Sequence, residues 1–80
     1  MTTDEIKRTV LRVLGEVAPE ADPSAIQPDL NLREQLDIDS VDFLNFVIGL
    51  HKEFQVEIPE KEYPRLFTLN GCVDYFGAKR

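Results

Sequence analysis

Residues 36–42 read Leu-Asp-Ile-Asp-Ser-Val-Asp and stand directly before an apolar segment with helical spacing. Ser40 therefore falls where a helix should begin. A serine at a helix N-cap normally turns its hydroxyl inward to accept a backbone N–H. Here Asp39 can take the capping role instead, which leaves the Ser40 hydroxyl free and facing solvent. Such a hydroxyl is well placed to carry a phosphate ester, because the helix dipole and the unpaired N–H groups favour negative charge there.

The length of the chain favours a small binding module or carrier over an enzyme. We expect residues 1–80 to form a single domain. A domain of this size buries only about 60–65% of the surface of its unfolded chain. Two lobes with a deep substrate cleft between them do not fit. We therefore predict a protein without enzymatic activity of its own.

The negative charge of the chain is concentrated in its middle. The formal net charge is −6, whereas residues 21–62 hold ten acidic and three basic side chains and so carry −7. An acidic surface repels phosphate backbones, which argues against nucleic acid as a partner. It suits docking to basic patches on other proteins, although a face that only keeps the protein soluble explains the charge equally well.

Cysteine content and hydropathy predict a cytoplasmic protein. Cys72 is the only cysteine, so no disulfide can form within the chain. We expect its thiol to fill the core rather than to react. Residues 1–5 lack the apolar segment of a signal peptide, and no apolar run approaches the roughly 20 residues of a membrane span. We expect a soluble monomer with no membrane span.

A first helix is predicted over residues 3–17. Thr2 and Glu5 match a capping box, and Pro19 closes the helical pattern. The apolar residues that recur on one face of this helix are Ile6, Val10, Val13, Leu14 and Val17.

A long connection follows the first helix. Two prolines interrupt it, and residues 22–25 are expected to form one helical turn. A loop of this length in a small domain is usually functional or disordered, but its spaced leucines favour a packed one. We expect the anchors to the core to be Leu30, Leu32 and Leu36.

The second predicted helix, residues 40–54, is the most informative element. The residues that share one broad apolar arc of this helix, and should face the core, are Phe43, Leu44, Phe46, Val47, Leu50 and Phe54. Val41 and Ile48 lie together outside that arc, on an otherwise polar face. An apolar pair on a polar face indicates a contact surface for a partner. Gly49 is also expected to face outward, where a partner could approach closely.

The rest of the chain predicts an extended link, a short helix and a final helix. The link covers residues 55–59, and residues 60–66 hold at most two helical turns because Pro64 removes a backbone donor. Thr68 caps the final helix, which we expect to end near Phe76. Its inward residues are Leu69, Cys72, Val73 and Phe76. The predicted fold class is all-α, a small four-helix bundle with three longer helices and one short helix.

Neither a hydrolase nor a calcium site fits the pattern around Ser40. His51 is the only histidine, and eleven residues along a helix separate it from Ser40 by about 16 Å, too far for a nucleophile and its base. Asp37 and Asp39 match the first positions of an EF-hand loop, but Val41 and Ile48 stand where later ligands are needed. We predict no catalytic residue and no resident metal, with at most weak divalent binding to the acidic surface.

The same segment resembles the acyl carrier protein family, whose members carry a phosphopantetheine arm on a serine. The Asp-Ser-Leu motif of that family corresponds to Asp39-Ser40-Val41 here, a conservative departure. The resemblance covers nearly the whole chain and includes Glu57-Ile58-Pro59 and the final helix capped by Thr68. A lone Asp-Ser-Val would be weak evidence, but the tripeptide at a helix start within this order of elements is strong.

The resemblance implies a role for each matching position. Ser40 is the attachment site of 4′-phosphopantetheine, and Asp39 orients the phosphopantetheinyl transferase and its magnesium ion. Acyl groups travel on the arm as thioesters between enzymes of a fatty-acid, polyketide-like or other specialised acyl pathway. The residues expected to contact the transferase and the acyl-loading, condensing or tailoring enzymes are Val41, Asp42, Asn45 and Ile48.

Departures from the family pattern favour a specialised carrier. Asp37 stands where carriers of dissociated fatty acid synthesis usually have glycine, and the acidic charge of the second helix is diluted by Asn45, His51 and Lys52. The bulky Phe43 and Phe46 predict a reduced interior and hence a short or polar cargo.

Two related interpretations stay open on the sequence alone. One is an aminoacyl carrier, which uses the same attachment. The other is an unmodified interaction module of the same fold that docks a partner through Val41 and Ile48.

Overall fold

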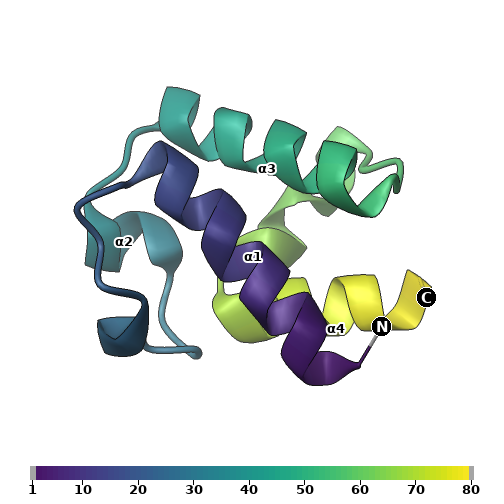
Figure 1. The fold of residues 1–80 in the computed structure, drawn as a ribbon. Coiled ribbons are helices and arrows are strands. Elements are labelled where there is room, and N and C mark those ends of the chain that lie inside the picture. Colours follow the sequence, from purple (N-terminus) through teal and green to yellow (C-terminus); the bar gives the residue numbers. More distant parts are fainter. Residues whose placement is uncertain (1, 80) are drawn as a thin grey trace.

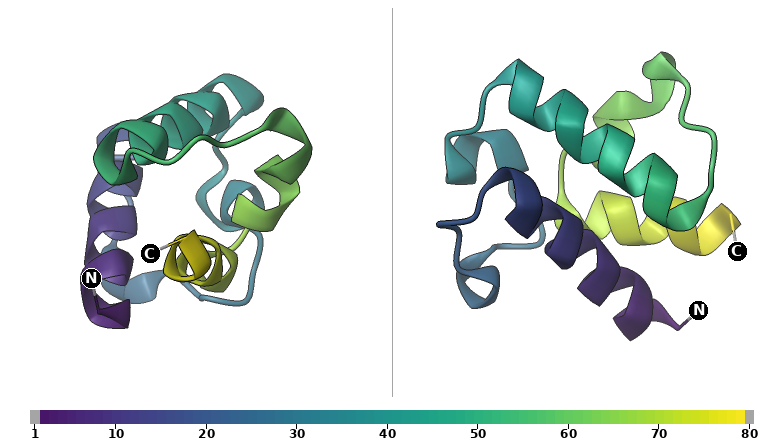
Figure 2. Two further views of the ribbon diagram at one scale, coloured as in Figure 1. Left: turned by 90° about the vertical axis from the view of Figure 1, so that its right-hand side faces the viewer. Right: turned by 45° about the horizontal axis from the view of Figure 1, so that its top comes forward.

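Three long helices form the frame of the molecule, namely α1 (Thr3–Val17), α3 (Ser40–Phe54) and α4 (Leu69–Lys79). The short helix α2 (Leu32–Leu36) and two 3₁₀ helices, η1 (Pro23–Ala25) and η2 (Glu60–Leu66), lie between them. The computed structural model describes residues 2–79, and every regular element in that range is helical. Figure 1 shows the order of the elements, and the left view of Figure 2 shows α1, α3, η2 and α4 around a common interior. The predicted all-α class is confirmed.

The start of α1 is fixed by the predicted capping box. The N–H of Glu5 donates to Oγ1 of Thr2 at 3.2 Å, and the N–H of Thr2 donates to the Glu5 carboxylate at 2.9 Å. The helix ends at Val17, and Ala18 closes its last turn just before Pro19, which cannot continue the hydrogen-bond pattern. Val17 is half-buried, and the buried face consists of Ile6, Val10, Val13 and Leu14.

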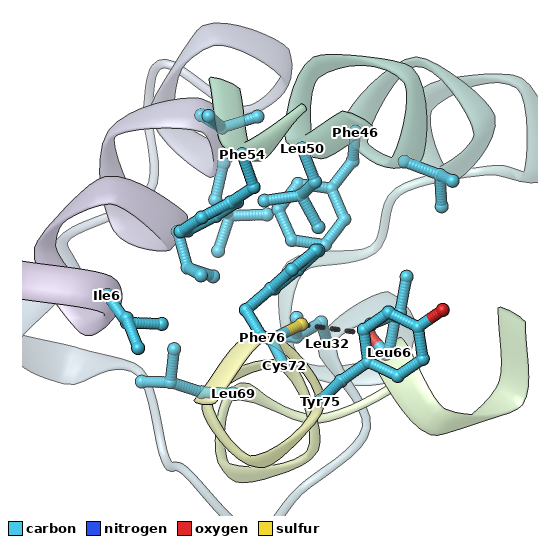
Figure 3. Packing of buried hydrophobic residues seen from close by; sticks show 14 of the residues in the cluster. Ile6, Leu32, Phe46, Leu50, Phe54, Leu66, Leu69, Cys72, Tyr75 and Phe76 are labelled. Carbon is cyan, nitrogen blue, oxygen red and sulfur yellow. Dashed lines mark hydrogen bonds between the residues drawn. The ribbon is translucent and has the colours of Figure 1, made fainter. Parts of the chain in front are cut away.

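Apolar side chains from α1, α3, η2 and α4 fill the interior (Figure 3). Phe54 of α3 stacks on Phe76 of α4 with ring centroids 4.2 Å apart. Cys72 is fully buried, and its thiol donates to the carbonyl oxygen of Leu66 at 3.4 Å. Burial raises the pKa of this thiol to about 12. Cys72 is therefore a core residue, as predicted, and stays uncharged at neutral pH.

The long connection between α1 and α3 is packed against the start of α4. The N–H of Leu32 donates to the carbonyl oxygen of Phe67 at 2.7 Å, and the N–H of Asn70 donates to that of Pro28 at 3.1 Å. The predicted helical turn is η1, capped by Asp22. These bonds satisfy backbone groups that a packed loop would otherwise bury unpaired.

Leu30 does not anchor this connection, contrary to the prediction. Its side chain is 47% exposed, whereas Leu32 is fully buried and Leu36 is half-buried. The backbone at Leu30 is held by a polar contact, because the Gln35 side chain donates to its carbonyl oxygen at 3.0 Å. A hydrogen bond therefore replaces the expected apolar anchor at this point.

The spacing of apolar residues does not predict α2, which has only five residues. Asn31 caps this helix by accepting from the N–H of Arg33 at 2.8 Å. Asp37 ends it with a left-handed backbone, φ 54°. A helix this short falls below the window in which periodicity can be recognised, so the capping residue is its one local signal.

The segment after α3 agrees with the sequence pattern. Pro64 lies within η2, as predicted for a short helix over residues 60–66. Thr68 accepts from the N–H of Gly71 at 2.9 Å and so starts α4, which runs to Lys79 rather than ending near the predicted Phe76. Residues 77–79 are exposed and give no apolar signal for the extra length. Val73 is half-buried, and the buried inward residues include Leu69, Cys72 and Phe76.

Tyr75 fastens η2 to α4. Its ring is buried, and its hydroxyl donates to the Glu62 carboxylate. This hydrogen bond lowers the pKa of Glu62, while burial and the same bond raise the pKa of Tyr75 to about 12. The guanidinium of Arg65 lies over the ring, 5.0 Å from its centroid. These contacts hold η2 at a fixed place on α4.

Gly49 faces α1 and not solvent, contrary to the prediction. A Cβ placed on Gly49 would lie 2.6 Å from Cγ1 of the buried Val13. Glycine in a helix interior costs about 1 kcal/mol relative to alanine, and here it allows close contact between α3 and α1. Gly49 is therefore a helix-packing residue.

We expect Gly49→Ala to lower the free energy of unfolding by about 1–3 kcal/mol, because the added methyl overlaps the stiff Val13 side chain. Gly15→Ala is the matched control, since no atom of residues 2–79 beyond its own helix backbone and chain neighbours lies within 4 Å of its added Cβ. The Gly15→Ala substitution should raise the free energy of unfolding by up to about 1 kcal/mol, because alanine has a higher helix propensity than glycine. Urea unfolding followed by circular dichroism measures both. A Gly49→Ala protein as stable as the Gly15→Ala protein would contradict the close contact.

Candidate functional site

Asp39 caps α3, and Ser40 is the first residue of that helix. The N–H of Asp42 donates to Oδ1 of Asp39 at 2.8 Å, and the N–H of Phe43 donates to the Asp39 carbonyl oxygen at 3.0 Å. Asp39 has the extended backbone of an N-cap residue, with φ −87° and ψ −178°. Ser40 is exposed, and its hydroxyl makes no hydrogen bond to any residue in the range 2–79. The hydroxyl is free to receive another group.

A short segment between α2 and α3 holds this helix start in place (Figure 1). Ile38 is only 8% exposed and anchors the segment to the molecule. Asp37 has a left-handed backbone, φ 54°, which glycine adopts freely and which aspartate tolerates better than most residues. Asp37 in place of the expected glycine thus occupies a conformation that glycine also favours.

Three apolar side chains form a stripe on the outer face of α3. Val41 is 63% exposed and Ile48 is 41% exposed, as predicted for residues outside the core arc. Leu44 is 44% exposed, so the prediction that it faces the core is wrong. It stands at the edge of that arc, where neighbouring elements cover it only in part. We call Val41, Leu44 and Ile48 the outer stripe, and beside it Asn45 is exposed and Asp42 is half-buried.

A hollow opens beside Ser40 between α3 and η2. Its volume of about 410 Å³ lies in the range of small-molecule sites. Most of its lining is apolar, and the residues are Arg33, Ser40, Phe43, Leu44, Glu60, Tyr63, Pro64 and Phe67. No sequence pattern predicts this Ser40 hollow, because its lining comes from separate segments that only the fold brings together.

His51 stands near the other end of α3 and cannot assist Ser40. Its Nδ1 lies 2.8 Å from the carbonyl oxygen of Val56, which follows the helix. Because α3 is continuous from Ser40 to Phe54, the two side chains are separated by about 16 Å of helix. A Ser–His catalytic pair is therefore excluded. Within the described chain, no three His, Cys, Asp or Glu side chains gather closely enough to hold a metal ion.

Comparison with known proteins identifies the family. A family model described as "Phosphopantetheine attachment site" matches residues 4–75. The chain belongs to the acyl carrier protein family. It is 35% identical over 75 residues to the acyl carrier protein of Lactobacillus johnsonii, and the alignment covers 94% of this chain and 92% of that protein. It is 30% identical over 79 residues to the acyl carrier protein of Thermosynechococcus vestitus, and this alignment covers 99% of this chain and 96% of that protein.

A solved acyl carrier protein also shares the fold. The acyl carrier protein from Enterococcus faecalis matches with a TM-score of 0.83 and 25% identity, over 100% of both chains. Acyl carrier proteins are carriers and not enzymes, and the family description indicates phosphopantetheine attachment. The resemblance based on Asp39-Ser40-Val41 is confirmed. None of the helices between residues 2 and 79 is long and apolar enough to cross a membrane.

We expect Asp39→Ala to lower the free energy of unfolding by about 1 kcal/mol, because α3 loses the oxygen that accepts the N–H of Asp42. Asp39→Asn keeps an acceptor oxygen there and should remain close to wild type. Ser40→Ala should also remain close to wild type, since its hydroxyl makes no bond that the substitution removes. Urea unfolding of the three variants measures this. A loss for Ser40→Ala as large as that for Asp39→Ala would mean that Ser40 caps the helix.

Proposed function

We propose that this protein carries acyl intermediates as thioesters on a 4′-phosphopantetheine arm attached to Ser40. The main support is the exposed Ser40 hydroxyl at the first position of α3, which makes no hydrogen bond within the described part of the chain. The helix dipole and the N–H groups of the first turn favour the negative charge that a phosphodiester brings. The family match supplies the kind of group that attaches.

The proposed attachment is a phosphoryl transfer from coenzyme A. The Ser40 oxygen attacks the phosphorus that bears the pantetheine, forming the Oγ–P bond. The bond from that phosphorus to the bridging pyrophosphate oxygen breaks, and 3′,5′-ADP leaves with that oxygen. The hydroxyl proton passes to a base of the partner enzyme, because His51, the only histidine of the chain, is remote from Ser40. A phosphopantetheinyl transferase is therefore the first partner.

Asp39 has two roles in this proposal. Its Oδ1 caps α3. Its Oδ2 makes no hydrogen bond in the described chain and is available to the magnesium ion of the transferase. Carboxylate oxygens are ligands that magnesium prefers. The same side chain thus fixes the start of the helix and orients the enzyme that modifies the next residue.

The cargo is an acyl group that acyl-loading, condensing or tailoring enzymes pass along a fatty-acid, polyketide-like or other specialised pathway. Asn45 and Lys52 are exposed on α3 and dilute its negative charge, which favours a specialised pathway with its own partner enzymes. Phe43 and Phe46 are buried, which favours a short or polar cargo. An aminoacyl cargo would use the same thioester.

Incubation with coenzyme A and a broad-specificity phosphopantetheinyl transferase should add one arm to the wild-type protein and none to Ser40→Ala. Intact-protein mass spectrometry measures the addition. Ser24→Ala is the matched control, because Ser24 is the only other serine and is also exposed, and this variant should load fully. Unchanged mass of the wild-type protein, under conditions that modify a known carrier, would contradict the proposal. An arm on Ser40→Ala would contradict the site.

The outer stripe of α3 is the proposed contact surface for the transferase and for later enzymes. Val41, Leu44 and Ile48 expose apolar area on one face, and Asp42 and Asn45 add polar groups beside them. Apolar residues with a charged surround are typical of the centre and rim of a protein interface. The acidic charge of this part of the chain favours enzymes with a basic rim.

We expect Val41→Asp and Ile48→Asp each to lower kcat/KM for arm transfer at least about tenfold, because a charge then enters an apolar contact. Leu30→Asp is the matched control, since Leu30 is 47% exposed but lies outside α3. Initial rates at limiting carrier concentration measure the effect. Equal rates for all three variants would remove the outer stripe as the contact surface. A partner that binds the unmodified protein tightly and never requires the arm would favour the interaction module.

A further inference from the structure

Arg33 lines the wall of the Ser40 hollow. It lies on α2 directly after Leu32, which is fully buried. Its own N–H donates to the Asn31 side chain at 2.8 Å, and the N–H of Leu32 donates to Phe67 at 2.7 Å. Two hydrogen bonds therefore hold the backbone at the start of α2, and the Arg33 side chain lines the hollow beside Ser40.

The guanidinium of Arg33 has no partner in residues 2–79. Its Nε is buried and makes no hydrogen bond, which is true of no other side-chain nitrogen or oxygen in that range. No carboxylate in the described chain forms an ion pair with it. An unpaired buried donor is unfavourable, and more so in a charged group, so native proteins nearly always supply an acceptor. Arg33 lines the Ser40 hollow and also a second one, formed with Asn31, Glu34, Ile38 and Phe67, but only the first is lined by Ser40.

The rest of the hollow suits a carbon chain. Phe43, Leu44, Pro64 and Phe67 give it apolar walls, and a mostly apolar pocket with one convergent polar group is typical of a small-molecule site. Glu60 also lines the hollow but lies outside ion-pairing distance of Arg33, so the cation stays available. Ser40 lies at the same hollow, so a group tethered there can return into it.

We infer that Arg33 is a specificity-determining residue that binds the carboxylate of an acyl group carried on the Ser40 arm. This inference rests on the proposed function and adds the chemical class of the cargo, an acyl chain ending in a carboxylate. The planar guanidinium presents parallel N–H donors that match the two carboxylate oxygens. The carbon chain of the cargo packs against the apolar walls while its charged end meets Arg33.

The test compares two cargoes of equal carbon number on the wild-type protein. Butyryl and succinyl forms are made by enzymatic transfer from the corresponding coenzyme A thioesters, beside a form with the free thiol arm. The succinyl form should melt about 4–8 °C above the butyryl form, the shift expected from one net favourable contact of this kind in a domain of this size. Arg33→Gln should remove that difference, and Arg33→Lys should keep only part of it.

Arg8→Gln is the matched control for charge. Arg8 is exposed on α1, away from the hollow, so this variant should keep the full succinyl–butyryl difference. Melting of the arm-free proteins shows whether each variant folds. If Arg33→Gln does not fold, the Nε–H resonance of Arg33 in the wild-type protein decides, because it should shift on succinyl loading and not on butyryl loading.

Each other outcome overturns the inference. Equal melting temperatures and an unmoved Nε–H resonance for the two loaded forms would remove it while leaving Ser40 attachment intact. If the Arg33-dependent rise in melting temperature is already complete in the form with the free thiol arm, Arg33 binds the phosphodiester and not the cargo. Failure of the wild-type protein to accept any arm would overturn the proposed function itself, and this inference with it.

Discussion

The hydrogen bond from the N–H of Asp42 to the Asp39 carboxylate, 2.8 Å long, sets the position at which α3 begins. Because aspartate supplies this cap, the serine that follows is released from the role that serines usually take at helix starts. Ser40 is then the first helical residue, exposed and with no side-chain hydrogen bond to residues 2–79. The hydroxyl, the positive end of the helix dipole and the free N–H groups meet at one point. The proposed transfer takes its base and its metal ion from the partner enzyme, and this chain supplies the hydroxyl, the Asp39 carboxylate and the contact surface on α3.

The remainder of the fold keeps that helix start in place. Ile38 anchors the segment before it, and the left-handed Asp37 turns the chain from α2 into α3. Helix α2 is in turn tied to the start of α4 through Leu32 and Phe67. On the other side, Gly49 brings α3 close to Val13 of α1. The long connection is thus a structural brace, which explains how so small a domain tolerates it.

Elements with caps and long apolar periods were predictable from the sequence, whereas the environments of some single residues were not. The bounds of α1 and α3 follow from the capping residues of these helices and from the spacing of their apolar residues. Thr2 and Glu5 cap α1, and Asp39 caps α3. A helical wheel gives the direction in which Leu44 and Gly49 point from α3. It does not say which neighbouring element lies in that direction. Leu44 therefore proved exposed and Gly49 proved to face α1. The Leu30 side chain also proved exposed, and a hydrogen bond from Gln35 holds its backbone carbonyl instead.

One part of the site is likewise predictable from neighbouring residues in the sequence, and the other part depends on the folded structure. Ser40 and its cap lie next to each other in the sequence, so local rules locate them. The hollow beside Ser40 is built from α2, α3, η2 and Phe67, which no local pattern connects. The unpaired Nε of Arg33 becomes visible only when those segments are assembled. The charge pattern of the sequence alone does not distinguish Arg33 from the other basic residues expected on the surface.

The most direct test of this account is phosphorus–proton correlation NMR on the arm-loaded protein, combined with amide exchange at the start of α3. We expect one phosphodiester signal correlated with the β protons of Ser40, and an Asp42 amide that exchanges as slowly as in the unloaded protein. A signal on another residue, or loss of protection at Asp42 on loading, would show that the hydroxyl of Ser40 had been holding the helix.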